Sequence, residues 1–469
     1  MKRAEVEFNT FASLGEPERA IPDYEQDNAK RGAILRQYLD FVGPLSPFLE
    51  IGANAGHTSY LLANSFHADG FALDISAGAL RHGAFLRDHW GLTRSPVRVA
   101  GDALNLPFRD GSLRFVMAFQ VLSQFMDMDA VFREVHRVLM PGGVFFFGDE
   151  PIRRRLTLGL FRSPYYESMK PWERKLHDRG LLGFLVKDVI GAHQEESVGI
   201  RQNHRMCLRD WENLVDRHFV ARRFLIQYPQ RGWMEEKAAA VGRRMNSDAN
   251  AGAAGLLGGT LSAFCRKAGA TPQTSADPEQ FERLLRCPDC HEQLVRGTSD
   301  GVACAACSYS APNEDGVYTL IRSSERGELY PGNRADIVDC GLPGHEEKLR
   351  EGWHELEGVF ANKYRWIAER AVVLLKRVRP GPQKLRVRGF VPEQAFQSGD
   401  PVSVHAVVNG LAAGHWLIDR PGLFVLETIV PDAAEYRVEI SALPRWTVPE
   451  DDRVFSINLS LVRLVEASS

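Results

Sequence analysis

The chain has 469 residues, with 57 lysines and arginines against 60 aspartates and glutamates, so its net charge is −3. A charge this close to zero excludes a global field that would recruit nucleic acid or an anionic membrane, and any such binding must be local. Hydrophobic residues make up 44% and charged residues 25%, which excludes wholesale disorder and fibrous repeats. At roughly 150 residues per domain, the length indicates about three domains.

The N-terminal segment MKRAEVEFNTFASLGEPERA has no apolar core after its basic start, so it is not typical of a secretion signal. No run reaches about 18 uninterrupted apolar residues, and no transmembrane helix is expected. Four of the seven cysteines form two C-x-x-C pairs, which in a chain without a signal sequence favour metal binding over a disulfide framework. These features predict a cytoplasmic protein.

The first half of the chain alternates between apolar strands and helical stretches. Residues 1–45 form a polar lead with one amphipathic helix, AKRGAILRQYLDFV. Between residues 47 and 148 the expected strands are PFLEI, GFALD, VRVAGD, RFVMAF and VFFFG. The helix before the last of them, in FREVHRVLMPGG, is expected to be stopped by Pro141 and Gly142. This alternation predicts an α/β fold with a doubly wound, Rossmann-like sheet, followed by two more strands, FVARRFLI and LSAFCRK.

Three further segments follow a different pattern. Residues 150–218 interrupt the alternation with a basic and aromatic insertion, residues 281–323 contain the paired cysteines, and residues 324–350 are expected to form a loop. From residue 351 onward, short β-like runs separated by turn signals favour an antiparallel β-sandwich. The predicted parts are a helical lead (1–45), a sheet domain (46–268), a cysteine domain (281–323) and a β-sandwich (351–466).

The first strand of the sheet domain runs into the sequence EIGANAG, at residues 50–56, and then a helix. Glycines at a strand-to-helix turn let a ligand approach the backbone, beside the partly positive helix N-terminus. The dinucleotide-binding pattern G-x-G-x-x-G requires glycine at the position of Asn54. This difference weakens the alternative of a nicotinamide-dependent enzyme. Asp74 ends the second strand, placed to accept hydrogen bonds from both hydroxyls of a ribose. Asp102 follows the third strand, where a carboxylate can receive an adenine amino group.

Together these signals resemble the class I S-adenosylmethionine (SAM) methyltransferases, and most of all the branch that includes the quinone-biosynthesis methyltransferases. The matching stretches are FLEIGANAGHTSYLLA, FALDISAGALR, GDALNLPFRDGSLRFVMAFQVL and FREVHRVLMPGGVFFF, and LLGGTLSAFCRK is similar to the family's last, antiparallel strand. The SAM-binding residues that the resemblance implies are Glu50, Gly52, Ala53, Gly56, Asp74, Ile75, Asp102, Ala103, Phe119 and Gln120.

The resemblance also implies a role for most of these residues. Glu50, Gly52 and Gly56 hold the methionine end of SAM. The ribose lies at Asp74, and Ile75 and Asp102 contact the adenine. The sequence departs from the family at Asn54, which replaces a usual glycine. It also departs at residues 123–124, where Ser-Gln stands in place of a frequent His or Glu.

Methyl transfer needs mainly the alignment of acceptor, methyl group and sulfur, since the sulfonium is already activated. A hydroxyl acceptor also needs a proton acceptor. The catalytic candidates are Asp149 and Glu150, expected after the fifth strand, and His204 in GIRQNHRMCLRDW. The alternatives are plain strand-end carboxylates and a surface or helix-capping histidine.

The cysteine pairs are Cys287 with Cys290 and Cys304 with Cys307, and thirteen residues lie between the two pairs. Two such knuckles bring four thiolates into a tetrahedron around Zn²⁺, with two redox pairs or chance clustering as the alternatives. Residues 284–321 resemble the small zinc-ribbon activator subunit of tRNA and protein methyltransferases, which implies a scaffold that adds to the methyltransferase sheet. The cysteines without such spacing, expected to be ordinary thiols, are Cys207, Cys265 and Cys340.

The insertion and the tail suggest how an acceptor binds. The insertion is interpreted as a lid over an acidic or amphiphilic acceptor, or as an interfacial helix in transient contact with a membrane surface. The alternative is a helical cover with a solvated basic face. The tail resembles β-sandwich tails of bacterial glycosyltransferases and methyltransferases of surface-glycan synthesis. Its tryptophans could stack on sugars or belong to the core: Trp353, Trp366, Trp416 and Trp446.

The leading prediction is a SAM-dependent methyltransferase that O-methylates a saccharide, a glycan-linked acceptor or another small molecule. RNA or translation-factor methylation is an alternative suggested by the ribbon's relatives, but the near-neutral charge opposes it. A non-catalytic SAM-binding scaffold is a third hypothesis. The intact Gly52, Gly56, Asp74 and Asp102 argue against that hypothesis.

Overall fold

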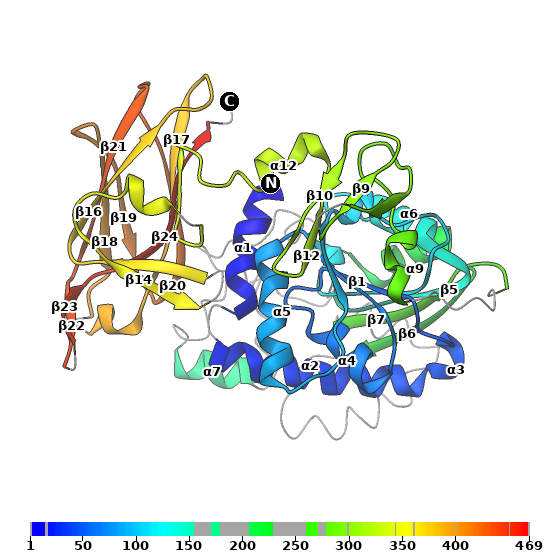
Figure 1. The fold of residues 1–469 in the computed structure, drawn as a ribbon. Coiled ribbons are helices and arrows are strands. Elements are labelled where there is room, and N and C mark those ends of the chain that lie inside the picture. The colour runs from blue at the N-terminus through cyan, green and yellow to red at the C-terminus, as the bar shows by residue number, and fades with distance from the viewer. Residues whose placement is uncertain are drawn as a thin grey trace. The chain divides into compact units, whose positions relative to one another are not determined.

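The computed structural model describes most of the chain in two compact units. The described residues up to Glu325 form the first unit and those from Arg326 form the second (Figure 1). The described residues are 2–14, 17–153, 170–178, 206–227, 259–270, 278–297, 300–342, 344–359, 362–397, 399–449 and 451–467. His204 and most of the 150–218 insertion lie outside them. Among the described helices, none is long and apolar enough to cross a membrane.

The first unit is built on a nine-stranded sheet with the order β11-β12-β3-β2-β1-β4-β5-β7-β6. Its central strands are β1 (Phe48–Ile51), β2 (Gly70–Asp74), β3 (Val97–Gly101), β4 (Leu113–Phe119) and β5 (Leu139–Ile152). These five run parallel, whereas β7 (Gly259–Arg266) pairs antiparallel with both β5 and β6 (Ala221–Gln227). The predicted Rossmann-like sheet is therefore confirmed, including its antiparallel strand.

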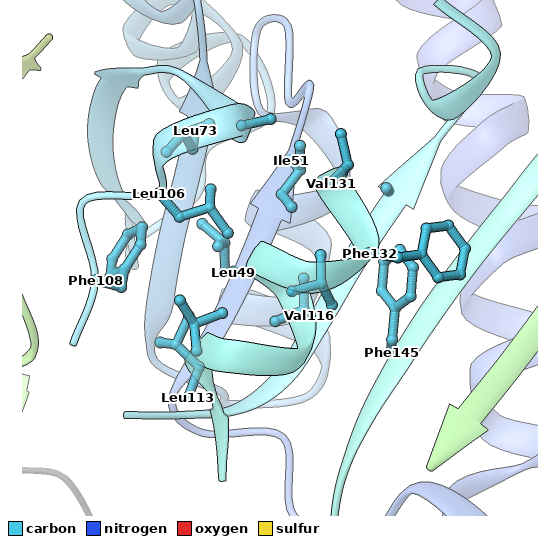
Figure 2. Packing of buried hydrophobic residues seen from close by; sticks show 14 of the residues in the cluster. Leu49, Ile51, Leu73, Leu106, Phe108, Leu113, Val116, Val131, Phe132 and Phe145 are labelled. Atoms are coloured by element: carbon cyan, nitrogen blue, oxygen red, sulfur yellow. The ribbon is translucent and has the colours of Figure 1, made fainter. Parts of the chain in front are cut away.

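The parallel strands are recognisable in the sequence because they are buried on both faces. All seven residues of β4 are buried, so its sequence is a continuous apolar run rather than an alternating one. Figure 2 shows Leu49, Ile51 and Val116 from the strands packing against Val131 and Phe132. The latter two belong to α6 (Met128–Val138).

Helix α6 stops before Pro141 and Gly142, the residues that the sequence indicated as its stop signal. Its last residue is Val138, and Leu139 already pairs with Leu113 as the first residue of β5. A proline disfavours the helical conformation of the residue before it, so the helix does not continue through Met140. Pro141 and Gly142 themselves belong to β5.

The N-terminal lead is more helical than the sequence predicted. It contains α1 (Lys2–Leu14), α2 (Pro17–Gln37) and α3 (Leu39–Val42), in place of one helix over residues 29–42. Helix α1 packs on α5 (Ala77–His89), and the hydroxyls of Thr10 and Ser76 are 2.6 Å apart. Tertiary contacts of this kind stabilise a helix whose own sequence pattern is weak. The structure also describes these helices in the first unit: α4 (His57–Ser65), α7 (Pro171–Asp178), α9 (Leu208–His218), η1 (Ala103–Asn105), η2 (Leu122–Gln124) and η5 (Pro278–Leu284).

The cysteine segment belongs to the first unit and extends its sheet. A small antiparallel sheet is formed by β8 (Leu294–Arg296), β9 (Val302–Cys304) and β10 (Ser310–Ala311). The next strands, β11 (Asn313–Glu314) and β12 (Val317–Leu320), lie at the edge of the large sheet, where β12 runs parallel to β3. Leu285 and Cys287 share one buried core with Leu106 and Phe108.

The second unit contains two larger antiparallel sheets and one short hairpin. One sheet has the order β14-β15-β24-β17-β20, with β13 beside β24, and the other has the order β16-β21-β18-β19. Residues of both sheets form one buried cluster, including Val387 and Leu464 of the first and Val404 and Val438 of the second. The strands are β13 (Ile337–Asp339), β14 (Trp353–Val359), β15 (Asn362–Ile367), β16 (Arg370–Lys376), β17 (Gln383–Val391), β18 (Val402–Val408), β19 (Leu411–Ile418), β20 (Gly422–Ile429), β21 (Glu435–Leu443), β22 (Trp446–Val448), β23 (Asp451–Phe455) and β24 (Asn458–Glu466).

Two details of this region differ from or refine the predictions. Residues 324–350, expected as a loop, contain β13, η6 (His345–Lys348) and most of α12 (Ser323–Leu329); η7 (Glu393–Phe396) lies further on. All four tryptophans named above are half-buried. Trp353, Trp416 and Trp446 pack against the core, and the ring of Trp366 contacts that of Trp446 edge-on.

Candidate active site

A cavity of about 540 Å³ lies at the carboxyl ends of β1 to β4. This is the edge of a parallel α/β sheet where ligands bind. The structure brings eight of the ten predicted SAM-binding residues together in its lining: Glu50, Gly52, Asp74, Ile75, Asp102, Ala103, Phe119 and Gln120. The other two, Ala53 and Gly56, lie in the same loop but outside the lining.

The loop after β1 depends on residues with a left-handed backbone. Gly52 has φ +68°, and a Cβ there would lie 2.6 Å from the Val121 side chain, so no other residue fits. Asn54 has φ +53°, a conformation that asparagine tolerates better than most residues, which explains how it replaces a glycine. Ala53 donates its N–H to the carbonyl of Leu73, and Gly56, with φ +80°, is the N-cap residue that precedes α4.

Two buried carboxyls organise this loop. Asp74 accepts hydrogen bonds from the N–H groups of Asn54 (2.9 Å) and Ser76 (2.8 Å), and burial raises its pKa to about 6. Glu50 accepts from the N–H of Ser59 at 2.8 Å and from its hydroxyl at 2.5 Å. Burial raises the pKa of Glu50 to about 7. Both carboxyls therefore connect β1 and β2 to the helices that follow them.

The N-terminal helix reaches the cavity, which the sequence did not reveal. Lys2, Glu5 and Asn9 of α1 are lining residues. The Nζ of Lys2 lies 2.7 Å from Asp102 and 2.5 Å from Glu325, at the end of the first unit. This contact spans a hundred residues and depends on how α1 packs, so no local pattern could have predicted it.

A polar cluster from α2 and α4 forms another part of the lining. Arg31 donates from Nη1 to the hydroxyl of Thr58 (2.7 Å) and to Nε2 of His57 (2.8 Å), and from Nη2 to Asp27 (2.8 Å). The ring of Tyr24 stacks on His57 with a centroid distance of 4.2 Å. Burial lowers the pKa of His57 to about 4, so its imidazole is neutral at pH 7. The position of His57 directly after the glycine loop was the available sequence signal.

The predicted catalytic carboxylates have other partners in the structure. Asp149 and Glu150 lie within β5 rather than after it, and neither belongs to the cavity lining. The Glu150 carboxylate is fully buried and accepts hydrogen bonds from three consecutive N–H groups, those of Val121, Leu122 and Ser123, at 2.8–3.0 Å. Asp149, with φ +59°, pairs with Lys30 and Arg31. Both carboxylates thus hold the elements around the cavity. The third candidate, His204, is outside the described residues.

The four paired cysteines form a cluster in the first unit. Their sulfur atoms all lie within 4.8 Å of one another, with 3.4 Å between Cys290 and Cys304 and 3.7 Å between Cys287 and Cys307. Four thiol ligands at this spacing fit the tetrahedral site that zinc prefers. The other cysteines, Cys207, Cys265 and Cys340, are not part of the cluster.

The cysteine segment is bonded to the loop that carries Asp102. The side-chain amide of Asn105 donates to the carbonyl of Pro288, between the first two cysteines, at 3.1 Å. The backbone N–H of Arg286 donates to Pro107 (3.1 Å), and that of Arg109 donates to Leu284 (2.8 Å). One loop therefore lines the cavity on one side and contacts a cysteine knuckle on the other.

Comparisons with known proteins agree with this geometry. Residues 49–147 match the family model of a methyltransferase domain. The chain is 40% identical over 104 residues to malonyl-[acyl-carrier protein] O-methyltransferase of Methylococcus capsulatus, covering 21% of this chain and 36% of that protein. It is 33% identical over 130 residues to the protein of the same name from Dechloromonas aromatica, covering 27% and 46%.

The chain spans less than half the length of these two relatives. Among solved structures, the YcgJ protein of Bacillus subtilis is 16% identical with a TM-score of 0.30, covering 50% of this chain and 98% of that one. The family match coincides with β1 to β5 and with the loops that line the cavity. Residues 49–147 are therefore similar to a methyltransferase domain, and they form the central strands of the Rossmann-like sheet.

Proposed function

We propose that the whole chain acts as a SAM-dependent methyltransferase and binds SAM in the cavity of the first unit. The observation that carries this proposal is the placement of Gly52, Asp74 and Asp102, which end three neighbouring strands at one cavity. In this proposal the glycine loop binds the methionine part of SAM. One carboxylate, that of Asp74, binds the ribose, and the other, that of Asp102, binds the adenine.

Bound SAM supplies an activated methyl group, and the chain positions it. Glu50 and Asp74 fix the loop that approaches the ligand, while Arg31 fixes α2 against α4. For an oxygen acceptor, His204, Asp149 and Glu150 remain the proposed proton acceptors. The three backbone hydrogen bonds to Glu150 favour a positioning role for that residue.

The proposed acceptor is a small molecule or a saccharide-linked compound, methylated at oxygen. Supporting it are the near-neutral charge of the chain and the names of two relatives that are O-methyltransferases. In this proposal the cysteine segment is a zinc ribbon with one structural Zn²⁺, and the second unit is a β-sandwich that helps to bind the acceptor.

Labelled-methyl transfer from SAM onto fractionated glycan, lipid, RNA and protein extracts tests the acceptor class. We expect label in carbohydrate or small molecules. Removal of residues 351–469 should reduce transfer to long glycans more than transfer to a small mimic. Label confined to RNA or protein would favour the translation-related alternative. SAM binding without any transfer would favour the scaffold.

Asp74→Asn is expected to raise the SAM dissociation constant at least tenfold. A charge-assisted hydrogen bond contributes about 1.5–3 kcal/mol, and the amide loses one of the two acceptors offered to the ribose. Asp69→Asn is the matched control, because Asp69 precedes the same strand and pairs with Arg94 away from the cavity. Calorimetric titration with SAM measures both variants. An unchanged dissociation constant for Asp74→Asn would remove Asp74 from the proposed ribose site.

Lys2→Ala is expected to strengthen SAM binding about two- to fivefold, the scale of a partly exposed ion pair. The lysine occupies an oxygen of Asp102 that the adenine amino group would use, and it places a positive charge near a cationic ligand. Lys30→Ala is the control, since Lys30 pairs with Asp149 outside the lining. Weaker SAM binding in Lys2→Ala would show that the lysine instead helps to hold the ligand.

A further inference from the structure

Two histidines face each other on the four-stranded sheet of the second unit, far in sequence from the cysteine cluster. His405 of β18 and His415 of β19 are directly paired across the two strands, and both are exposed. Their rings are stacked with a centroid distance of 4.2 Å and an interplanar angle of 7°. Strand β19 is the last strand of this sheet, so water reaches the pair.

The Nε2 atom of each ring points at the hydroxyl of Ser403. The Oγ of Ser403 lies 2.9 Å from Nε2 of His405 and 2.9 Å from Nε2 of His415. A hydroxyl donates one hydrogen bond and accepts others, so it satisfies both nitrogens when one Nε2 carries a proton and the other does not. The arrangement therefore gathers two metal-binding nitrogens around one point.

We propose that His405 and His415 form a binding site for a divalent late-transition-metal ion, of the class Zn²⁺, Ni²⁺ or Cu²⁺. Neutral imidazole is a ligand that these ions favour, whereas Mg²⁺ and Ca²⁺ prefer oxygen. An ion that binds two nitrogens at about 2.1 Å holds them about 3–4 Å apart. Rings stacked at 4.2 Å reach that separation through small side-chain rotations.

The surroundings leave room for the rest of the coordination shell. Ser403 offers a hydroxyl oxygen, and the neighbours of the pair along the sheet are small or apolar. Ser441 is opposite His405, and Leu417 and Leu443 are opposite Ser403. The remaining positions on the ion face water, so the site is open to exchange. This distinguishes it from the cysteine cluster, which is closed by four sulfur ligands.

The test uses the full chain loaded with one equivalent of zinc, so that the cysteine cluster is filled before titration. Calorimetric titration with Ni²⁺ is expected to show one further equivalent. His405→Asn and His415→Asn should each weaken this binding at least tenfold, and the double variant should abolish it. Ser403→Ala should change it less than threefold. His89→Asn is the matched control, because His89 is an exposed histidine of the first unit.

Paramagnetic Ni²⁺ gives an independent readout, since it broadens the imidazole proton signals of the residues that bind it. The signals of His405 and His415 should broaden first and together. Because both side chains are exposed, the asparagine variants should keep the unfolding midpoint of the parent chain. No further equivalent in the parent chain, or one that survives in the double variant, would overturn the proposal.

Discussion

Cys287→Ser is expected to release the metal from the cysteine cluster and to lower the free energy of unfolding of the first unit by about 4 kcal/mol or more. Cys287 is fully buried, and the three strands of its small sheet are only two or three residues long. Such short strands have few hydrogen bonds of their own, so the proposed zinc ion would contribute folding energy to this segment when bound. Metal content by elemental analysis and urea unfolding measure the two effects.

The same substitution should also weaken SAM binding. Asn105 and Arg109 are bonded to the cysteine segment, and their loop begins with Asp102. Cys207→Ser is the matched control, because Cys207 is a half-buried thiol outside the cluster, and it should retain about one equivalent of metal. A metal-free Cys287→Ser protein with the parent's unfolding curve would contradict the structural role of the site.

Glu150→Ala is expected to destabilise the first unit by about 3 kcal/mol or more, because it leaves three N–H groups, two of them buried, without an acceptor. These groups belong to the turn after β4, which also carries Gln120 and Val121 of the cavity lining. SAM affinity should therefore fall together with stability. Glu150→Gln keeps the shape and one acceptor oxygen, and it should lose less of both.

The titration of Glu150 gives this prediction a pH dependence. Burial raises its pKa to about 7, above the value in the unfolded chain, so the folded state holds the proton more tightly. The stabilisation that Glu150 contributes by binding this proton is complete at a pH below the pKa of Glu150 in the unfolded chain. It is lost as the pH rises toward 7. Glu150→Gln cannot titrate and should flatten the pH dependence of the unfolding midpoint in that range. A stable Glu150→Gln protein with turnover reduced a hundredfold would instead identify Glu150 as the proton acceptor.

The sequence predicted the central sheet and eight residues of the cavity lining for identifiable physical reasons. Parallel strands buried on both faces are continuous apolar runs, as β4 is. The loop after β1 needs a left-handed backbone, so Gly52 and Asn54 mark it. The acidic residues at strand ends, Asp74 and Asp102, follow directly from the strand positions.

Contacts between distant segments could not be predicted in the same way. Lys2 reaches Asp102 because α1 packs on α5, and the hydrogen bond from Asn105 goes to a backbone carbonyl. Backbone partners leave no pattern in a sequence. The spacing of the cysteines predicted that their sulfurs would meet, but not which loop of the sheet domain they would support.

The pairing of β3 with a later strand, β12, leaves one edge of the sheet unprotected while the chain is being synthesised. Without β12, strand β3 would be an open edge of a large apolar sheet, which is a template for pairing with another chain. Synthesis at about 5–20 residues per second needs on the order of 10–40 s to make the ~200 residues between the two strands. During that interval the nascent sheet exposes unpaired N–H and C=O groups. Chains truncated before residue 313 should therefore aggregate unless a chaperone covers that edge.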